Sequence, residues 1–129
     1  MKINSPLNEE EFWYLATMYD KHLEGHEAAH SMASEAAAKC LEKGIGVFCP
    51  ITHSYGIKHF AKDWDYNIAL GLDKLFLDKA RGLIVLCKPD TWTKSLGIDF
   101  EINYMREKNK PVIFWYGDET IGDKVGYYA

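Results

Sequence analysis

The sequence reads LIVLC from residue 83 to residue 87, a near-continuous apolar run. Such runs are typical of strands that are buried on both faces of a parallel sheet. Other runs with strand character lie at 12–16, 47–50 and 111–116, and segments with helical patterns separate them. This alternation predicts an α/β fold, a Rossmann-like three-layer sandwich with a mostly parallel sheet of four to five strands.

The segment between the first two strands is expected to be a long helix. It spans about 20–43, where apolar residues from Leu23 onward recur near helical spacing, and Gly44 follows as a stop signal. After the second strand, residues 51–62 are rich in His, Ser, Tyr and Gly, and we expect them to form a loop.

Two further helices are expected around the central strand. Asp63 can cap the first of them. The apolar face of this helix would carry large side chains at helical spacing: Trp64, Ile68, Leu72, Leu75 and Phe76. The other helix follows the central strand and runs over about 95–109, and residues 118–129 are expected to be a polar and aromatic tail.

Length and composition limit the class of protein. A chain of 129 residues fits one domain, so we expect a single domain over 1–129 in which 1–11 is a loosely held lead-in. No apolar run approaches the ~20 residues that cross a bilayer, and the N-terminus lacks a signal-peptide core. We therefore expect a cytoplasmic protein without membrane contact. The formal net charge of -4 argues against a nucleic acid polymer as partner.

Residues 90–101, DTWTKSLGIDFE, follow the central strand and are the first candidate site. Ser95 is a good N-cap, and a helix N-terminus presents unpaired N–H groups and partial positive charge to an anion. Gly97 lets a ligand approach the first turn. Glu101 lies one and a half turns into the helix and places a candidate nucleophile or base beside the anion site.

Residues 26–30 read HEAAH, which matches the H-E-x-x-H pattern of zinc metalloproteases. His26 and His30 share a helix face, so a zinc ion could bridge them with Glu27 as base. The segment after His30 lacks the Gly-x-x-His continuation, and the surrounding strand pattern is Rossmann-like. A surface helix that carries histidines by chance is therefore the favoured interpretation, and we expect no metal site.

Several short motifs occur along the chain in a fixed order. They are YLA at 14–16 followed by Tyr19, HS at 53–54, DW at 63–64, Asp73, SLG at 95–97 with Glu101, and KPV at 110–112. Together they resemble the nucleoside 2-deoxyribosyltransferase superfamily over roughly 14–114. The motif Trp-x-x-Ser-x-Gly-x-x-x-Glu, here Trp92 to Glu101, resembles a small bacterial and phage branch.

The resemblance implies a function for two carboxylates. Glu101 matches the superfamily's nucleophile, which attacks the anomeric carbon of the sugar, and Asp73 falls where a carboxylate assists the leaving base. Cleavage of an N-glycosidic bond passes through an oxocarbenium-like state that a carboxylate can capture. No cofactor is implied. The resemblance also implies a homodimer or higher homo-oligomer in which a neighbour closes the pocket, with the aromatic tail at 127–129 as one source of contacts.

Ser95 favours a nucleotide over a nucleoside substrate. The transferases have an aspartate six residues before the nucleophile, whereas the branch that hydrolyses deoxynucleoside 5'-monophosphates has a serine, as here. The Ser95 hydroxyl and the amides of Leu96 and Gly97 can bind a phosphate that an aspartate would repel. By the same resemblance, four further residues are expected to bind substrate: Tyr14, Tyr19, His53 and Trp92.

The chain departs from the superfamily at two places. The hydrolases have a loop with glycine and arginine after the first strand, where residues 17–22 here offer only Thr17 and Lys21 as donors. Arg81 stands where an aspartate usually precedes the central strand. The expected function is an N-glycosidase acting on a (deoxy)ribonucleoside 5'-monophosphate. Two alternatives stay open: base exchange by a deoxyribosyltransferase, and a non-catalytic nucleotide-binding or sensing module.

Overall fold

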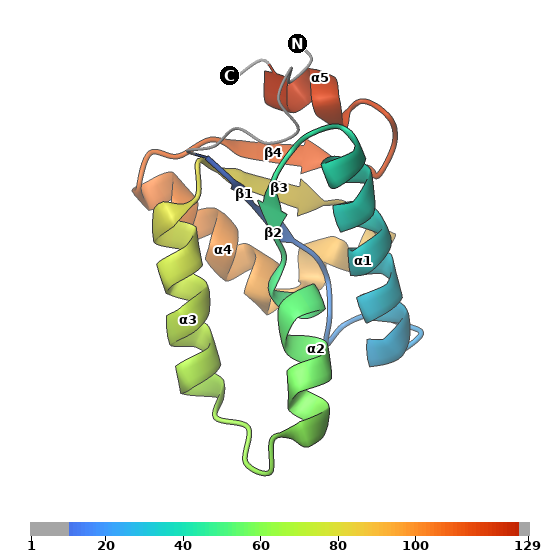
Figure 1. Ribbon diagram of the computed structural model, residues 1–129, viewed down its shortest axis with the longest axis vertical. Coiled ribbons are helices and arrows are strands. Elements are labelled where there is room, and N and C mark those ends of the chain that lie inside the picture. The colour runs from blue at the N-terminus through green and yellow to red at the C-terminus, as the bar shows by residue number, and fades with distance from the viewer. Residues whose placement is uncertain (1–10, 127–129) are drawn as a thin grey trace.

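The computed structural model describes residues 11–126. The described chain forms a four-stranded parallel sheet of β1 (Trp13–Ala16), β2 (Val47–Phe48), β3 (Leu83–Leu86) and β4 (Val112–Trp115), shown in Figure 1. The strand order is β2-β1-β3-β4, and each neighbouring pair is parallel. The expected α/β fold is confirmed. Most of the expected lead-in, residues 1–10, and the aromatic end at 127–129 lie outside the described residues.

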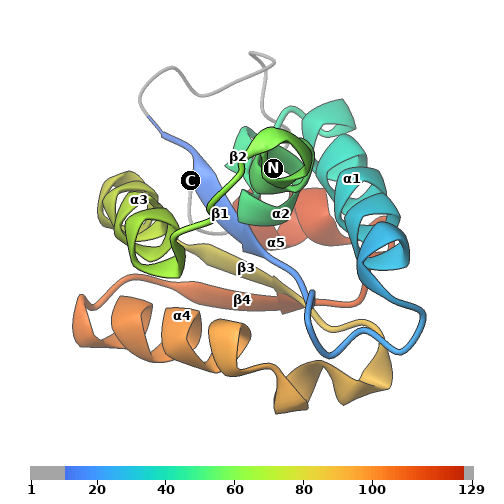
Figure 2. The ribbon, with the colours of Figure 1, turned by 90° about the horizontal axis from the view of Figure 1, so that it is seen from below.

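Helices cover both faces of the sheet. They are α1 (His26–Glu42), α2 (Pro50–Phe60), α3 (Tyr66–Lys79), α4 (Leu96–Glu107) and α5 (Ile121–Gly126), with a 3-10 helix η1 (Asp90–Lys94) before α4. Figure 2 shows α4 below the sheet and α1 and α5 on the opposite side. Within residues 11–126, no helix has the length and apolar character that crossing a membrane requires.

Alternation along the strands produces two separate cores. Leu15, Ile84 and Trp115 point to the face covered by α1 and α5. Tyr14 and Val85, on the opposite side of the same strands, pack in the core that includes α3 and α4. Because successive strand residues face opposite sides, a strand buried on both faces must be apolar at every position, as β3 is.

The first expected helix begins later than its sequence pattern indicated. Helix α1 starts at His26, and the segment before it forms turns in which the amide of His22 donates to the Tyr19 carbonyl. Gly25 closes these turns at φ 94°, in the left-handed region where other residues are strained. Leu23, expected on the apolar helix face, is therefore in a turn and 80% exposed.

The expected loop at 51–62 is wrong, because most of it is helix α2. Pro50 occupies the first turn of the helix, where its missing N–H costs no hydrogen bond and its fixed φ is already helical. The preceding strand ends at Phe48, two residues before the expected boundary. Pro50, which the sequence pattern predicts at the end of a strand, thus begins a helix.

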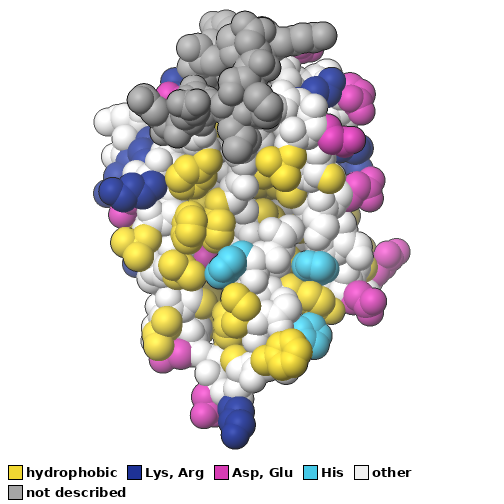
Figure 3. Space-filling model, in the orientation of Figure 1, with side chains coloured by type: hydrophobic (Ala, Val, Ile, Leu, Met, Phe, Trp, Pro, Cys, Tyr) yellow, Lys and Arg dark blue, Asp and Glu magenta, His cyan; other side chains and the backbone are white. Residues whose placement is uncertain are grey.

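Helix α3 differs from expectation in its cap and in its buried face. Asp65, not Asp63, is the N-cap: its carboxylate accepts hydrogen bonds from the amides of Asn67 and Ile68, at 2.8 and 3.3 Å. Ile68 and Leu75 are 73% and 61% exposed, whereas Leu77 is buried. The expected apolar face therefore points largely away from the sheet, and Figure 3 shows hydrophobic side chains gathered over α2 and α3.

The C-terminal third agrees better with the sequence. Ser95 is the N-cap of α4, as expected, and its Oγ accepts a hydrogen bond from the amide of Ile98 at 3.2 Å. The polar tail expected at 118–129 instead contains α5, because Ile121 and Val125 are buried against the sheet. Lys110 donates to three carbonyl oxygens at the end of α3 and so holds that helix to the start of β4.

Candidate active site

The strand order creates a crevice between β1 and β3. The chain leaves β1 towards β2 on one side and leaves β3 towards β4 on the other, so the connections diverge at the carboxyl ends of these two central strands. Ligands of open α/β sheets bind at such a switch point. A cleft of about 350 Å³ lies here, lined by the segment after β1, the start of α2, the side of α3 and the first turns of α4.

We call this cleft the carboxylate chamber, because Glu101 of α4 and Asp73 of α3 both line it. Burial raises the pKa of Glu101 to about 8, and the charge of Asp73 adds to this effect. Burial also raises the pKa of Asp73, to about 6, although His53 opposes the shift. The two carboxyl groups therefore share one site and titrate at different pH.

Tyr14 supports Glu101 from the sheet. The side chain of Tyr14 is fully buried in β1, and its hydroxyl lies close enough to Glu101 to lower the pKa of that carboxyl. The geometry falls outside that of a hydrogen bond, so the hydroxyl has no hydrogen-bond partner among residues 11–126. A small rotation of the side chain, or a bound ligand, would give the Tyr14 hydroxyl a hydrogen-bond partner. Such a change is favoured, because a buried hydroxyl without a partner costs free energy.

The first turn of α4 forms one end of the carboxylate chamber. Ser95 is buried and caps the amide of Ile98, whereas the amides of Leu96 and Gly97 belong to the first turn and have no intrahelical acceptor. A Cβ built on Gly97 would meet only the Ser95 Oγ, at 3.8 Å. The protein itself therefore leaves open space at this turn. Lys21 lines the same chamber and adds a positive charge.

A second cleft of about 170 Å³ adjoins the first. We call it the aromatic chamber, because its walls include Tyr19, Tyr55, Trp64 and Tyr66. The two chambers share part of their walls, Asp73 among the shared residues. The aromatic chamber extends the site between α2 and α3, where space for a planar ring adjoins the carboxylates.

Sequence reasoning missed most of the aromatic chamber because its α2 wall was expected to be a loop. Besides Pro50, four α2 residues line it: Ile51, Ser54, Tyr55 and Lys58. Their spacing of three, four and seven residues places them on one helix face. This spacing, together with a proline suited to the first turn, was the available signal.

The histidines of the HEAAH motif support the walls of these chambers. The His26 ring stacks on Tyr19, with centroids 4.1 Å apart, and its Nε2 lies 3.2 Å from the Asp20 carboxylate. The His30 ring stacks on Tyr55 at 4.4 Å. In the described part of the chain, no three His, Cys, Asp or Glu side chains are grouped so that they could hold a metal ion.

Three expected substrate-binding residues, His53, Trp92 and Tyr14, do not line either chamber. His53 is exposed and contacts the ring of Phe48, although its charge reaches Asp73. Trp92 lies in η1 and packs against Phe114, with ring centroids 5.8 Å apart. Tyr14 lies behind Glu101. The remaining expected residues come together and line the chambers: Glu101, Asp73, Ser95, Leu96, Gly97 and Tyr19.

The two places where the sequence departs from the expected resemblance differ in position. Thr17 and Lys21 line the carboxylate chamber, as their loop position indicated. Arg81 precedes β3 at the amino end of the strand, where it pairs with Glu11 at 3.7 Å, and the cleft lies beyond the carboxyl end. Arg81 is therefore remote from the site.

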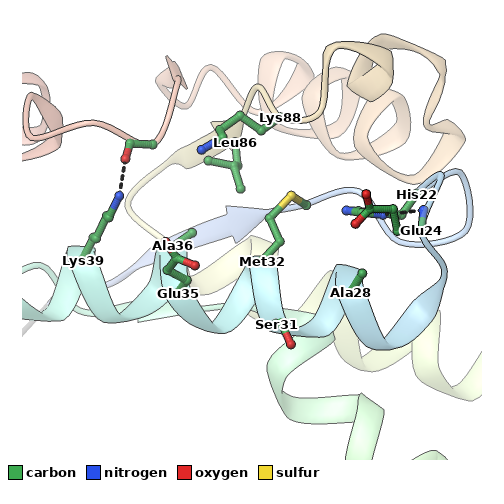
Figure 4. Close-up of a pocket in the computed structure, with 11 residues that line it drawn as sticks. His22, Glu24, Ala28, Ser31, Met32, Glu35, Ala36, Lys39, Leu86 and Lys88 are labelled. Carbon is green, nitrogen blue, oxygen red and sulfur yellow. Dashed lines mark hydrogen bonds between the residues drawn. The ribbon is translucent and has the colours of Figure 1, made fainter.

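Another hollow, of about 470 Å³, lies on the α1 face of β3 (Figure 4). It is open and lined by α1 together with Leu86, Lys88 and Gly117. Lys39 donates a hydrogen bond to the Gly117 carbonyl at 2.7 Å, so its ammonium group is already engaged. None of the expected site residues lines this hollow, and it has no buried carboxylate pair.

Comparison with protein-family models identifies a match that covers most of the chain. Residues 11–117 match the model of a family described as a domain of unknown function (DUF1937). No curated protein matches the chain significantly. The matched segment contains the whole sheet and both chambers.

Proposed function

The chain belongs to the DUF1937 family, and we propose that it is an N-glycosidase that cleaves the base–sugar bond of a (deoxy)ribonucleoside 5'-monophosphate. One observation carries the proposal: Glu101 and Asp73 line a single chamber whose end is the first turn of a helix. Two carboxyl groups beside a glycosidic bond can supply nucleophile and acid without a cofactor.

The reaction proceeds in two steps. A Glu101 oxygen bonds to the anomeric carbon while the carbon–nitrogen bond breaks, its electron pair goes to the base, and the protonated Asp73 donates a proton to the base. Water then attacks the anomeric carbon, Asp73 accepts the water proton, and the Glu101 carboxylate leaves. The products are the free base and the sugar phosphate.

The pKa order makes the productive ionisation state a minority of the free enzyme. At neutral pH, Glu101 is mostly protonated and Asp73 mostly ionised, whereas the reaction needs the reverse. The Tyr14 hydroxyl already lowers the pKa of Glu101, and a shorter contact in the substrate complex would stabilise the ionised carboxylate further. The pair as a whole needs one proton, so the rate should be greatest between the two pKa values.

The charge distribution supports a position for the phosphate. Asp20, Asp73 and Glu101 are the acidic residues that line the carboxylate chamber, and each of them repels a phosphate when it is ionised. The amides of Leu96 and Gly97 lie in the first turn of α4, which also lines the chamber, and offer a dipole suited to an anion. The phosphate would bind there, with the sugar over the carboxylates and the base towards the aromatic chamber.

The raised pKa of Glu101 favours one second candidate, a non-catalytic nucleotide-binding or sensing module, because a protonated carboxyl is a poor nucleophile. Base exchange differs from hydrolysis only in the acceptor. A panel of nucleosides and nucleoside 5'-monophosphates, incubated with wild type and Glu101→Gln and analysed for free base, separates these functions. Hydrolysis releases base with wild type only, exchange requires an added second base, and a binding module releases none.

We further propose a homodimer or higher oligomer in the cytoplasm. Several large apolar side chains on α2 and α3 are exposed: Ile57, Phe60, Tyr66, Ile68, Leu72 and Leu75. An apolar surface of this kind is typical of a protein interface, and a second copy would also cover the open side of the aromatic chamber. Light scattering of wild type and Ile68→Glu tests this, since a monomeric wild type contradicts it. The three free, buried cysteines suit a reducing compartment.

A further inference from the structure

Lys58 is the one positive side chain in the wall of the aromatic chamber. It extends from α2, and its ammonium group lies 5.2 Å from the ring centroid of Tyr19 and 5.4 Å from that of Trp64. The two rings come from different segments, the loop after β1 and the link between α2 and α3. Cation–π attraction to both rings holds the ammonium group at this wall.

The surroundings leave the charge of Lys58 available to a ligand. Among residues 11–126, no carboxylate forms an ion pair with it. Tyr19 is itself fixed by stacking on His26, so the position of the ammonium group is supported from behind. A half-buried lysine that lines the chamber, and that has no hydrogen-bond acceptor among residues 11–126, can donate a hydrogen bond to a ligand there.

The chemistry of the leaving base makes such a donor selective. When the glycosidic bond breaks, its electron pair passes to the base, and an oxo group on the ring takes up part of the negative charge. An ammonium group donates hydrogen bonds and accepts none, so it stabilises an oxo group and opposes an amino group at the same position. Asp73 lies in the wall shared by both chambers and can protonate the ring nitrogen.

We propose that Lys58 determines base specificity by donating a hydrogen bond to an oxo group, so that the enzyme prefers oxo-substituted bases to their amino analogues. The inference rests on the proposed N-glycosidase function. It names a class of base, not a single one: uracil, thymine and hypoxanthine carry the required oxo group, whereas cytosine and adenine present an amino group at the equivalent ring position.

Matched substrates and variants test the proposal. The 5'-monophosphates of deoxyuridine and deoxycytidine differ in one oxo or amino group, as do those of inosine and adenosine. Lys58→Met keeps the length of the side chain and removes the donor, Lys58→Arg keeps a donor, and Lys62→Met is an exposed control on the link to α3. The rate constant kcat/KM for base release is measured for each pair.

We expect wild type and Lys62→Met to prefer the oxo member by about ten- to a hundredfold, the effect of one charged hydrogen bond. Lys58→Met should lose that preference by slowing the oxo substrates alone, and Lys58→Arg should restore part of it. An equal decrease for both members would reduce Lys58 to a support for the rings and overturn the proposal, as would a wild-type preference for amino bases.

The two proposals can fail separately. If wild type releases no base from any nucleotide, the N-glycosidase function is wrong, and the same variants are then compared by calorimetric affinity for each nucleotide pair. A wild-type preference for the oxo member that disappears in Lys58→Met would keep Lys58 as the specificity residue of a binding site. Equal affinities would reject it there too. If base is released without discrimination, only the assignment of Lys58 fails.

Discussion

Replacing Glu101 with glutamine should make the protein more stable above pH 5. The folded-state pKa of Glu101 is about 8, against an ordinary value of 4.5, because burial disfavours the charged carboxylate. A raised pKa stabilises the fold fully below the unfolded pKa, and that stabilisation is lost as the pH rises through the folded pKa. Between the two values the unfolded chain gains by ionising, whereas the folded chain stays protonated.

The expected magnitude follows from the shift. At pH 7 the unfolded glutamate is ionised and the folded one mostly is not, which costs wild type about 3 kcal/mol relative to a side chain that never ionises. Glutamine has nearly the same shape and remains neutral. Glu101→Gln should therefore match wild type near pH 4 and exceed its free energy of unfolding by up to about 3 kcal/mol at pH 7.

Urea denaturation of both proteins at half-unit steps from pH 4 to pH 9 measures this difference. Glu107→Gln is the matched control, since Glu107 lies in the same helix but is exposed. Its difference from wild type should not vary with pH. The prediction is contradicted if the difference in free energy of unfolding between Glu101→Gln and wild type is also constant with pH, or if Glu101→Gln is the less stable protein at pH 8. Either result would show that Glu101 is ionised in the folded protein despite its burial.

Two other predictions concern the rate and the phosphate end of the cleft. A plot of wild-type kcat/KM against pH should be bell-shaped, with limbs near pH 6 and pH 8. Asp73→Asn should lose the decrease at high pH, because only Glu101 then titrates. If the decrease persists in Asp73→Asn, Asp73 is not the acid. Gly97→Ala should raise KM for nucleotides while changing the free energy of unfolding by less than about 1 kcal/mol. Gly82→Ala should instead destabilise the fold, because its Cβ would lie 2.5 Å from a tryptophan ring. An unchanged KM in Gly97→Ala would show that the phosphate does not bind at this turn.

The sheet could be predicted because each strand is a short apolar run and β3 is apolar throughout. The cap at Ser95 followed from local chemistry alone, which tertiary contacts did not alter. Helix α2 could not be recognised in the same way, since Pro50 is compatible with both a strand end and a helix start. The prediction of which face of α3 is buried was wrong, because residue spacing places Ile68 and Leu75 on one face but does not indicate whether that face points to the sheet or to solvent.

The candidate site shows a similar division. Glu101, Asp73 and Ser95 were expected from motifs, and the connections at the carboxyl ends of β1 and β3 bring them to one chamber. Stacking partners depend on where loops return in space, which explains why Trp92 packs on the sheet side instead of the cleft. For the same reason Lys58, held by two rings from separate segments, had no local signal of its role.

In the proposed reaction Glu101 is the nucleophile that releases the base. The most direct measurement is the rate of free-base release from deoxynucleoside 5'-monophosphates by wild type and by Glu101→Gln, at pH 7 and with equal folded protein. We predict release by wild type and a decrease of at least about a thousandfold in the variant, as expected when a nucleophile is removed. Release of base by Glu101→Gln at the wild-type rate would show that Glu101 is not the nucleophile.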